Sequence, residues 1–127
     1  MLVTQRYAYT GCFTSRWART PTDVPITAEG VQICRDKCTL SGFDYFGFEC
    51  PHENGAEVHC ECTNSINPSE KIEDQMCQQF NFNSGSHCTG PFVVNTDFGT
   101  YYMGAGGINS GYATSPVPSQ GKFISFF

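Results

Sequence analysis

The sequence predicts a small, disulfide-rich α+β domain in which one main helix packs on antiparallel strands. Three observations support this prediction. Eight cysteines lie within the first 88 residues, one segment has the spacing and caps of a helix, and two aromatic-rich or cysteine-rich segments flank an Asn-Gly turn. A chain of 127 residues has the length of a single domain with a modest core.

The cysteines are expected to form disulfides. Their number is even, and they are Cys12, Cys34, Cys38, Cys50, Cys60, Cys62, Cys77 and Cys88. A reducing cytosol would leave such thiols for metal binding or catalysis, whereas an oxidising compartment joins them. We therefore expect four disulfides, no free thiol, and a secreted protein outside the cell or at its surface. Because residues 1–10 lack the apolar core of a signal peptide, we take the sequence as a mature or recombinant form.

The first strand and the main helix are expected before residue 43. Residues 7–13 (YAYTGCF) alternate aromatic and small side chains, which favours a strand. Residues 14–25 have the Pro, Thr and Asp content of a loop. Residues 26–42 have the features of a helix, with Thr27 suited to the N-cap and Gly42 to the C-terminal stop.

Cysteines on this helix are expected to face cysteines on a strand. Cys34 and Cys38 are four residues apart, so they point the same way from successive turns. Two further segments read as strands joined by a turn with Asn-Gly at its centre, residues 43–50 and 58–62. Cys60 and Cys62 share one strand face because side chains repeat every two residues. The stretch VHCEC is therefore expected to form half of a double crosslink.

Shorter elements are expected in the second half of the chain. Residues 67–80 read as a short second helix with Asn67 as its cap. Residues 92–95 and 100–104 are strand candidates joined by a turn, and residues 105–120 read as loop followed by linker.

The order of these motifs resembles a WSC domain. The resemblance rests on YTGC at 9–12, a Thr-led helix with C-x-x-x-C, GFDYFGFE at 42–49 and C-x-C at 60–62, and it covers roughly residues 7–112. It implies a small extracellular module of PAN/apple-like architecture, in which a helix is stapled onto a twisted antiparallel sheet. It also implies a non-catalytic role in binding glycans.

The same resemblance suggests how the cysteines pair. By analogy with PAN-type domains we expect Cys34–Cys62 and Cys38–Cys60, with the order of these two pairs left open. The other four cysteines then bond among themselves, and the preferred pairs are Cys12–Cys88 and Cys50–Cys77. The chain departs from the family because Cys50 directly follows YFGFE and a late C-x-x-x-C is absent, so the family pairing carries over only in part.

Metal and catalytic interpretations of VHCEC are weaker. His59, Cys60 and Cys62 could contribute zinc ligands together with a distant cysteine. Ligands one residue apart on a strand converge on one ion less easily than a C-x-x-C knuckle does. His59 and Cys60 should point to opposite strand faces, which disfavours a Cys–His nucleophile. We expect no enzyme activity, no cofactor and no metal.

An acidic stretch spans the predicted hairpin, with no basic residue inside it. Its members could bind calcium or sugar hydroxyls, but a solvated acidic hairpin is the preferred interpretation. They are Asp44, Glu49, Glu53, Glu57 and Glu61.

Aromatic residues make up 14% of the chain. Sugar rings stack on exposed aromatic faces, whereas buried aromatic residues only pack the core. The candidates for a glycan-binding platform are Trp17, Tyr101, Tyr102 and Tyr112. Trp17 lies in the predicted loop between two arginines and is expected to be exposed.

Charge and the C-terminal tail bear on partners. The net charge of −5 argues against a nucleic-acid partner, and no apolar run approaches the roughly 20 residues of a membrane span.

We expect a domain at residues 1–114, followed by a linker and an apolar C-terminal strand at 115–127. That strand could join copies of the chain, so the alternative function is a structural subunit of an extracellular filament or surface assembly. Its candidate assembly residues are Phe123, Ile124, Phe126 and Phe127. O-glycosylation is expected, if present, within residues 19–23 or 114–119.

Overall fold

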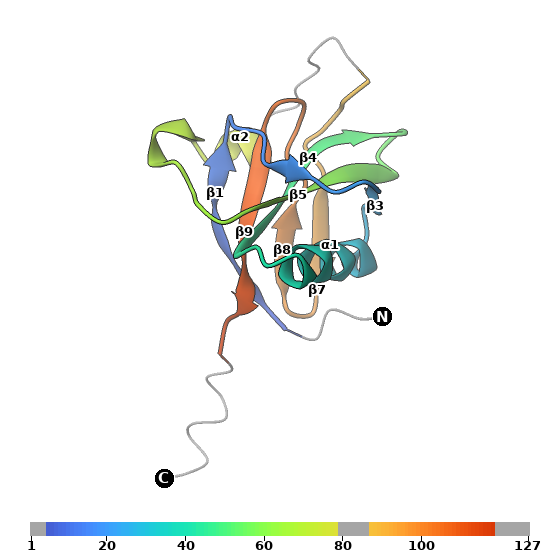
Figure 1. Cartoon of the computed structure of the whole chain (residues 1–127). Helices are drawn as coiled ribbons and strands as arrows, with labels where there is room; N and C mark the ends of the chain where they lie inside the picture. The colour runs from blue at the N-terminus through green and yellow to red at the C-terminus, as the bar shows by residue number, and fades with distance from the viewer. Residues whose placement is uncertain (1–4, 79–86, 119–127) are drawn as a thin grey trace.

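A computed structural model describes residues 5–78 and 87–118. Seven strands of the described chain form one antiparallel sheet (Figure 1). From one edge to the other its strands are β2 (Ala18–Arg19), β5 (Glu57–Thr63), β4 (Tyr45–His52), β9 (Asn109–Pro116), β1 (Tyr7–Phe13) and β6 (Lys71–Ile72), and β3 (Val24–Pro25) also pairs with β5. A separate hairpin joins β7 (Val93–Thr96) to β8 (Gly99–Tyr102). The expected small disulfide-rich α+β fold, with one main helix and an antiparallel sheet, is confirmed.

One face of the large sheet carries the main hydrophobic core. The helix α1 (Ala28–Leu40) and the β7–β8 hairpin both cover this face (Figure 1). Phe46, Phe48 and Tyr112 are fully buried on it, with ring centroids 5.6–6.0 Å apart. Burying an aromatic side chain of this size contributes roughly 1.5–3 kcal/mol. The strands β4 and β9 are therefore anchored at the centre of the domain.

Local signals place α1 as predicted. The Thr27 side chain accepts the backbone N–H of Gly30 at 3.1 Å, which satisfies one of the unpaired donors of the first turn. No helix in the described part of the chain has the length and apolar character needed to cross a membrane.

Two disulfides crosslink α1 to β5, but in the opposite order to the one expected. The pairs are Cys34–Cys60 and Cys38–Cys62, with Cα–Cα distances of 5.5 and 5.4 Å. Four residues of helix rise about 6 Å and two residues of strand about 6.6 Å, so both bonds form side by side. The order follows from chain direction, because α1 and β5 run the same way past each other.

The other two disulfides also differ from the expected pairs. They are Cys12–Cys77 and Cys50–Cys88, so all eight cysteines are bonded and none is free. Strand β6 pairs with β1 opposite Cys12 and brings the following turn, with Cys77, to it. The backbone N–H of Thr89 donates to Pro51 O at 2.7 Å and places Cys88 beside Cys50.

Two segments differ from the predicted secondary structure. The segment expected as loop and linker contains β9, a central strand that runs two residues beyond the expected domain boundary at 114. Its sequence, NSGYATSP, lacks the β-branched and aromatic alternation of a typical strand, and hydrogen bonds to β1 and β4 on both sides hold it. The described part of the expected helix at 67–80, residues 67–78, is instead a short 3₁₀ turn (Pro68–Glu70), then β6, then the single turn α2 (Gln75–Gln78). Pairing with β1 and the Cys12–Cys77 bond override its helical pattern.

The opposite face of the sheet carries a row of glycines beneath Trp17. Gly111 pairs with Gly11 on one side and with Gly47 on the other. A Cβ atom at Gly111 would lie 2.5 Å from the Trp17 ring, and one at Gly47 would lie 2.9 Å from it. The missing side chains therefore leave the space that the indole fills.

Candidate functional site

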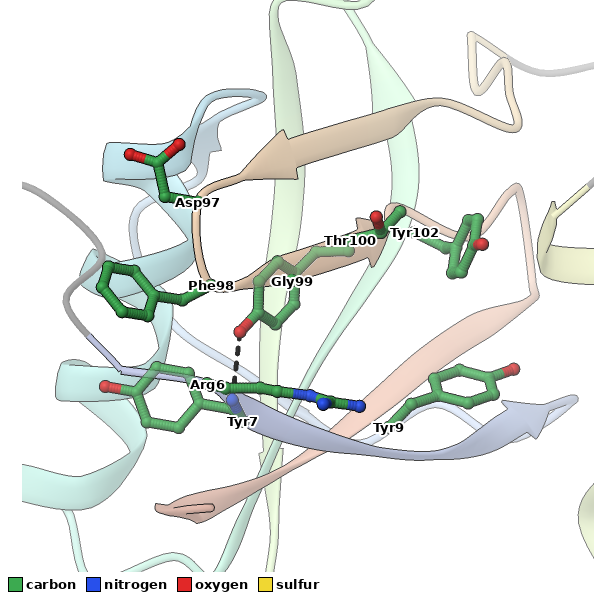
Figure 2. Close-up of a pocket in the computed structure, with 9 residues that line it drawn as sticks. Arg6, Tyr7, Tyr9, Asp97, Phe98, Gly99, Thr100 and Tyr102 are labelled. Carbon is green, nitrogen blue, oxygen red and sulfur yellow. Dashed lines mark hydrogen bonds between the residues drawn. The ribbon is translucent and has the colours of Figure 1, made fainter. Parts of the chain in front are cut away.

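An aromatic groove lies between the start of β1 and the β7–β8 hairpin (Figure 2). Its volume of about 610 Å³ falls within the roughly 300–1,000 Å³ of typical small-molecule sites. It is lined by Arg6, Tyr7, Tyr9, Asp97, Phe98, Gly99, Thr100, Tyr101 and Tyr102. Five of these nine residues are aromatic, so the groove offers ring faces together with a few polar groups.

A hydrogen bond joins the two sides of the groove at its floor. The hydroxyl of Tyr101 accepts the backbone N–H of Tyr7 at 3.0 Å and ties the hairpin to β1 (Figure 2). Gly99 has a φ of +137°, a conformation that side chains rarely adopt, and the Arg6 stem lies 3.7 Å from the position its Cβ would occupy. The turn therefore needs glycine where the two segments meet.

Tyr9 and Tyr102 form one end of the groove. Their ring centroids are 6.2 Å apart, and the Tyr9 hydroxyl donates to Asp74 Oδ1 at 3.0 Å. Burial, and then the Asp74 carboxylate, raise the pKa of Tyr9, and burial raises the pKa of Tyr101. These phenols are therefore neutral at physiological pH and bring no charge to the groove.

Phe98 forms the other end, and polar side chains lie along the groove. The Phe98 side chain is 45% exposed at the tip of the hairpin. Figure 2 shows the side chain of Arg6, the residue before β1, lying between this ring and the two tyrosines Tyr9 and Tyr102. Asp97 and Thr100 are exposed on the hairpin side. One cationic, one anionic and one neutral group thus border the groove, with the Asp97 carboxylate directed away from Arg6 (Figure 2).

The structure separates the four predicted platform residues. Tyr101 and Tyr102 line the groove, Tyr101 as its buried floor and Tyr102 half-buried. Tyr112 is 0% exposed beneath them, where its hydroxyl accepts the N–H of Tyr102 at 2.7 Å. Tyr112 is therefore a core residue and has no surface to offer a ligand.

Trp17 lies on the other face of the sheet and is half-buried, contrary to the exposure expected from its sequence context. Its ring centroid is 5.6 Å from that of Phe13, and it fills the space above the glycine row. The flanking arginines stay exposed while the indole packs, because its neighbours lack side chains.

Sequence reasoning missed part of the groove. Tyr7 and Tyr9 are two residues apart in a predicted strand, so they were recognisable as neighbours on one face. Phe98 stands in the predicted turn, where an apolar ring is expected to be exposed. No local signal indicates that β1 and this turn meet, because 84 or more residues separate them along the chain.

Two members of the acidic stretch are buried, which contradicts the solvated interpretation for them. Glu49 and Glu61 are each 2% exposed on the Trp17 face of the sheet, while Asp44, Glu53 and Glu57 are exposed. Glu61 Oε1 accepts the N–H of Trp17 at 2.9 Å. Burial and then the neighbouring Glu49 carboxyl raise the pKa of Glu61 to about 8 against that hydrogen bond. Glu61 is therefore protonated near neutral pH.

The remaining predicted sites are the VHCEC stretch and the apolar C-terminal tail. Cys60 and Cys62 are both in disulfides, so the zinc and nucleophile interpretations of VHCEC lose their thiolates. The apolar tail, with Phe123, Ile124, Phe126 and Phe127, lies outside the described residues, and its part in self-association stays a prediction.

Comparison with protein-family models, with curated proteins and with solved structures finds no match to this chain. The resemblance to WSC domains therefore stays a prediction from the sequence motifs.

Proposed function

We propose that this protein is a non-catalytic carbohydrate-binding module that works outside the cell and holds glycans in the aromatic groove. The observation that carries the proposal is the groove itself, in which Tyr9, Phe98 and Tyr102 present aromatic surface beside Arg6 and Asp97. The apolar faces of sugar rings stack on such side chains, and their hydroxyls both donate and accept hydrogen bonds.

The charge and shape of the groove support a neutral sugar. Arg6 and Asp97 carry opposite charges at the border of the groove, and the phenols carry no charge at physiological pH. Sugar hydroxyls can bond to both side chains, because the Arg6 guanidinium donates hydrogen bonds and the Asp97 carboxylate accepts them. A groove open along its length would hold part of a chain of sugars, so binding per site should be weak and gain strength through multivalent display.

Location outside the cell is supported by the four disulfides, which persist in oxidising compartments. The WSC-like motifs at residues 9–12, 42–49 and 60–62 point in the same direction.

The test is a glycan array probed with multivalently displayed protein, followed by calorimetry with any sugar that binds. Phe98→Ala and Tyr102→Ala each remove an aromatic face and should weaken binding at least tenfold, or about 1.4 kcal/mol. The matched control is Leu40→Ala, which removes a side chain that is 88% exposed at the end of α1 and should leave affinity unchanged.

Two results would contradict the proposal. The first is an array without binding above background for the wild-type protein. The second is binding that survives both groove substitutions in folded variants but is lost in Trp17→Ala, which would move the sugar site to the opposite face of the sheet.

A further inference from the structure

All three histidines of the chain gather at one place, away from the aromatic groove. The ring centroid of His52 lies 5.1 Å from that of His59 and 5.4 Å from that of His87. One ring nitrogen from each of the three lies within 4.8 Å of the other two. We call His52, His59 and His87 the histidine cluster.

The backbone holds these side chains together from three separate segments. His52 ends β4 and His59 lies in β5, on neighbouring strands of the hairpin. His87 directly precedes Cys88, which is bonded to Cys50, two residues before His52. The Cys50–Cys88 disulfide therefore holds the backbone of His87 close to His52 and His59.

Buried carboxylate and backbone groups orient His59. Its Nδ1 lies 2.9 Å from Glu49 Oε1, and the other carboxylate oxygen of Glu49 accepts the N–H of Gly107 at 2.7 Å. Glu49 is 2% exposed, so it supports His59 from the protein interior. A histidine that donates Nδ1–H to a carboxylate presents the Nε2 lone pair, which is the usual support behind a metal-bound imidazole.

His52 is held from both sides. Its Nε2 lies 2.9 Å from Asp23 Oδ2, and its Nδ1 lies 2.7 Å from the carbonyl oxygen of Cys50. Because each ring nitrogen meets an oxygen atom, a metal ion must displace one of these two contacts to reach the ring.

Solvent reaches the cluster. His59 and His87 line a cavity of about 420 Å³ that also borders Glu49 and Glu61, and His87 is exposed. A tetrahedral ion with nitrogen ligands at 2.0–2.1 Å needs donors about 3.4 Å apart. Ion binding would therefore bring the three ring nitrogens, which lie within 4.8 Å of one another, to this spacing.

The ligand chemistry selects the ion. Imidazole nitrogens suit Zn²⁺ and Cu²⁺, whereas Ca²⁺ and Mg²⁺ take oxygen ligands. All cysteines are in disulfides and supply no thiolate. We propose that the histidine cluster binds one Zn²⁺ or Cu²⁺ ion, with Glu49 and Asp23 as positioning residues. Three imidazoles leave one position of a four-coordinate ion open to water or a ligand.

Calorimetric titration of the untagged, fully oxidised chain with Zn²⁺ and with Cu²⁺, each in a non-chelating buffer, tests this proposal. One ion should bind per chain. The Cu²⁺ form should show nitrogen hyperfine splitting in its electron paramagnetic resonance spectrum. His87→Ala, at an exposed side chain, should lower affinity at least tenfold. Glu49→Gln, which keeps the size of a positioning residue, should lower it ten- to hundredfold.

Asp97→Asn is the matched control, because it removes a carboxylate at the aromatic groove and should leave metal affinity unchanged. A melting curve for each variant separates lost ligands from lost fold. The proposal is overturned if neither ion binds stoichiometrically at micromolar concentration, or if folded His87→Ala and His59→Ala bind as the wild type does. Binding of Ca²⁺ alone would also overturn it, because carboxylates would then be the ligands.

Discussion

Replacing Gly111 by alanine should destabilise the protein because Trp17 occupies the space that the new methyl group needs. The added Cβ would lie 2.5 Å from the indole Cη2 and 2.9 Å from Thr10 Oγ1. Carbon atoms in contact prefer 3.5–4.0 Å, so the ring must move by about 1 Å. Gly47 lies under the same ring, which leaves it only an outward path. Overpacking of this kind costs about 1–3 kcal/mol.

The same substitution should cost less once the indole is removed. In a Trp17→Ala background the closest obstacle is gone, and two contacts of the new Cβ remain, with Phe13 Cε2 at 3.2 Å and with Thr10 Oγ1 at 2.9 Å, which has no hydrogen-bond partner among the described residues. Alanine in place of glycine also restricts the unfolded chain, which by itself stabilises by about 0.4–1 kcal/mol. The double-mutant cycle should therefore give a coupling energy of about 1–3 kcal/mol between positions 17 and 111.

Urea unfolding of the four proteins with their disulfides intact measures this coupling. The signal should be far-UV circular dichroism, because Trp17 is the only tryptophan and its fluorescence is lost in two of the variants. If Gly111→Ala costs nothing, or costs the same in both backgrounds, the indole does not rest on the glycine row. Trp17 would then be available again as a ligand-binding residue.

Three further predictions concern the crosslinks, the buried acids and the core. A reductant should unfold the protein and EDTA should not, as thermal melts will show, because four disulfides close loops worth about 3–4 kcal/mol each. A large loss of stability with EDTA alone would contradict this. The folded chain holds a proton on Glu61 that the unfolded chain releases between pH 4.5 and about 8, so stability should fall as the pH rises through this window. Glu61→Gln should flatten that slope in urea titrations, and an unchanged slope would argue against the buried carboxyl pair. Tyr112→Phe leaves the N–H of Tyr102 without its acceptor and should cost about 1–3 kcal/mol, whereas an unchanged unfolding midpoint would mean that another acceptor replaces it.

Local chemistry made much of the fold predictable. The Thr27 cap, the hairpin with Asn-Gly at its turn and the strand at residues 7–13 each depend on neighbours within a few residues, and the structure has all three. The approach of two helix cysteines to two strand cysteines was predictable as well, because four residues of helix and two of strand cover nearly the same distance.

The candidate site was predictable only in part. Tyr101 and Tyr102 were recognised as aromatic residues in a strand, and both line the groove. Exposure could not be derived for Trp17 or Tyr112, because it depends on which residues face them across the sheet. The same reason explains Glu49 and Glu61, which look solvated in an acidic stretch but lie on a face that Trp17 covers.

The sequence by itself determined that this is a small, fully disulfide-bonded domain with one main helix and an antiparallel hairpin, because cysteine count, caps and turn residues act locally. Tertiary structure alone decided the disulfide partners, since these depend on the direction in which α1 passes β5 and on β6 reaching β1. It also decided that the polar segment at residues 109–116 is a central strand, because hydrogen bonds from both neighbours outweigh its weak strand propensity. The groove and the histidine cluster arise in the same way, from residues that only long-range pairing brings together.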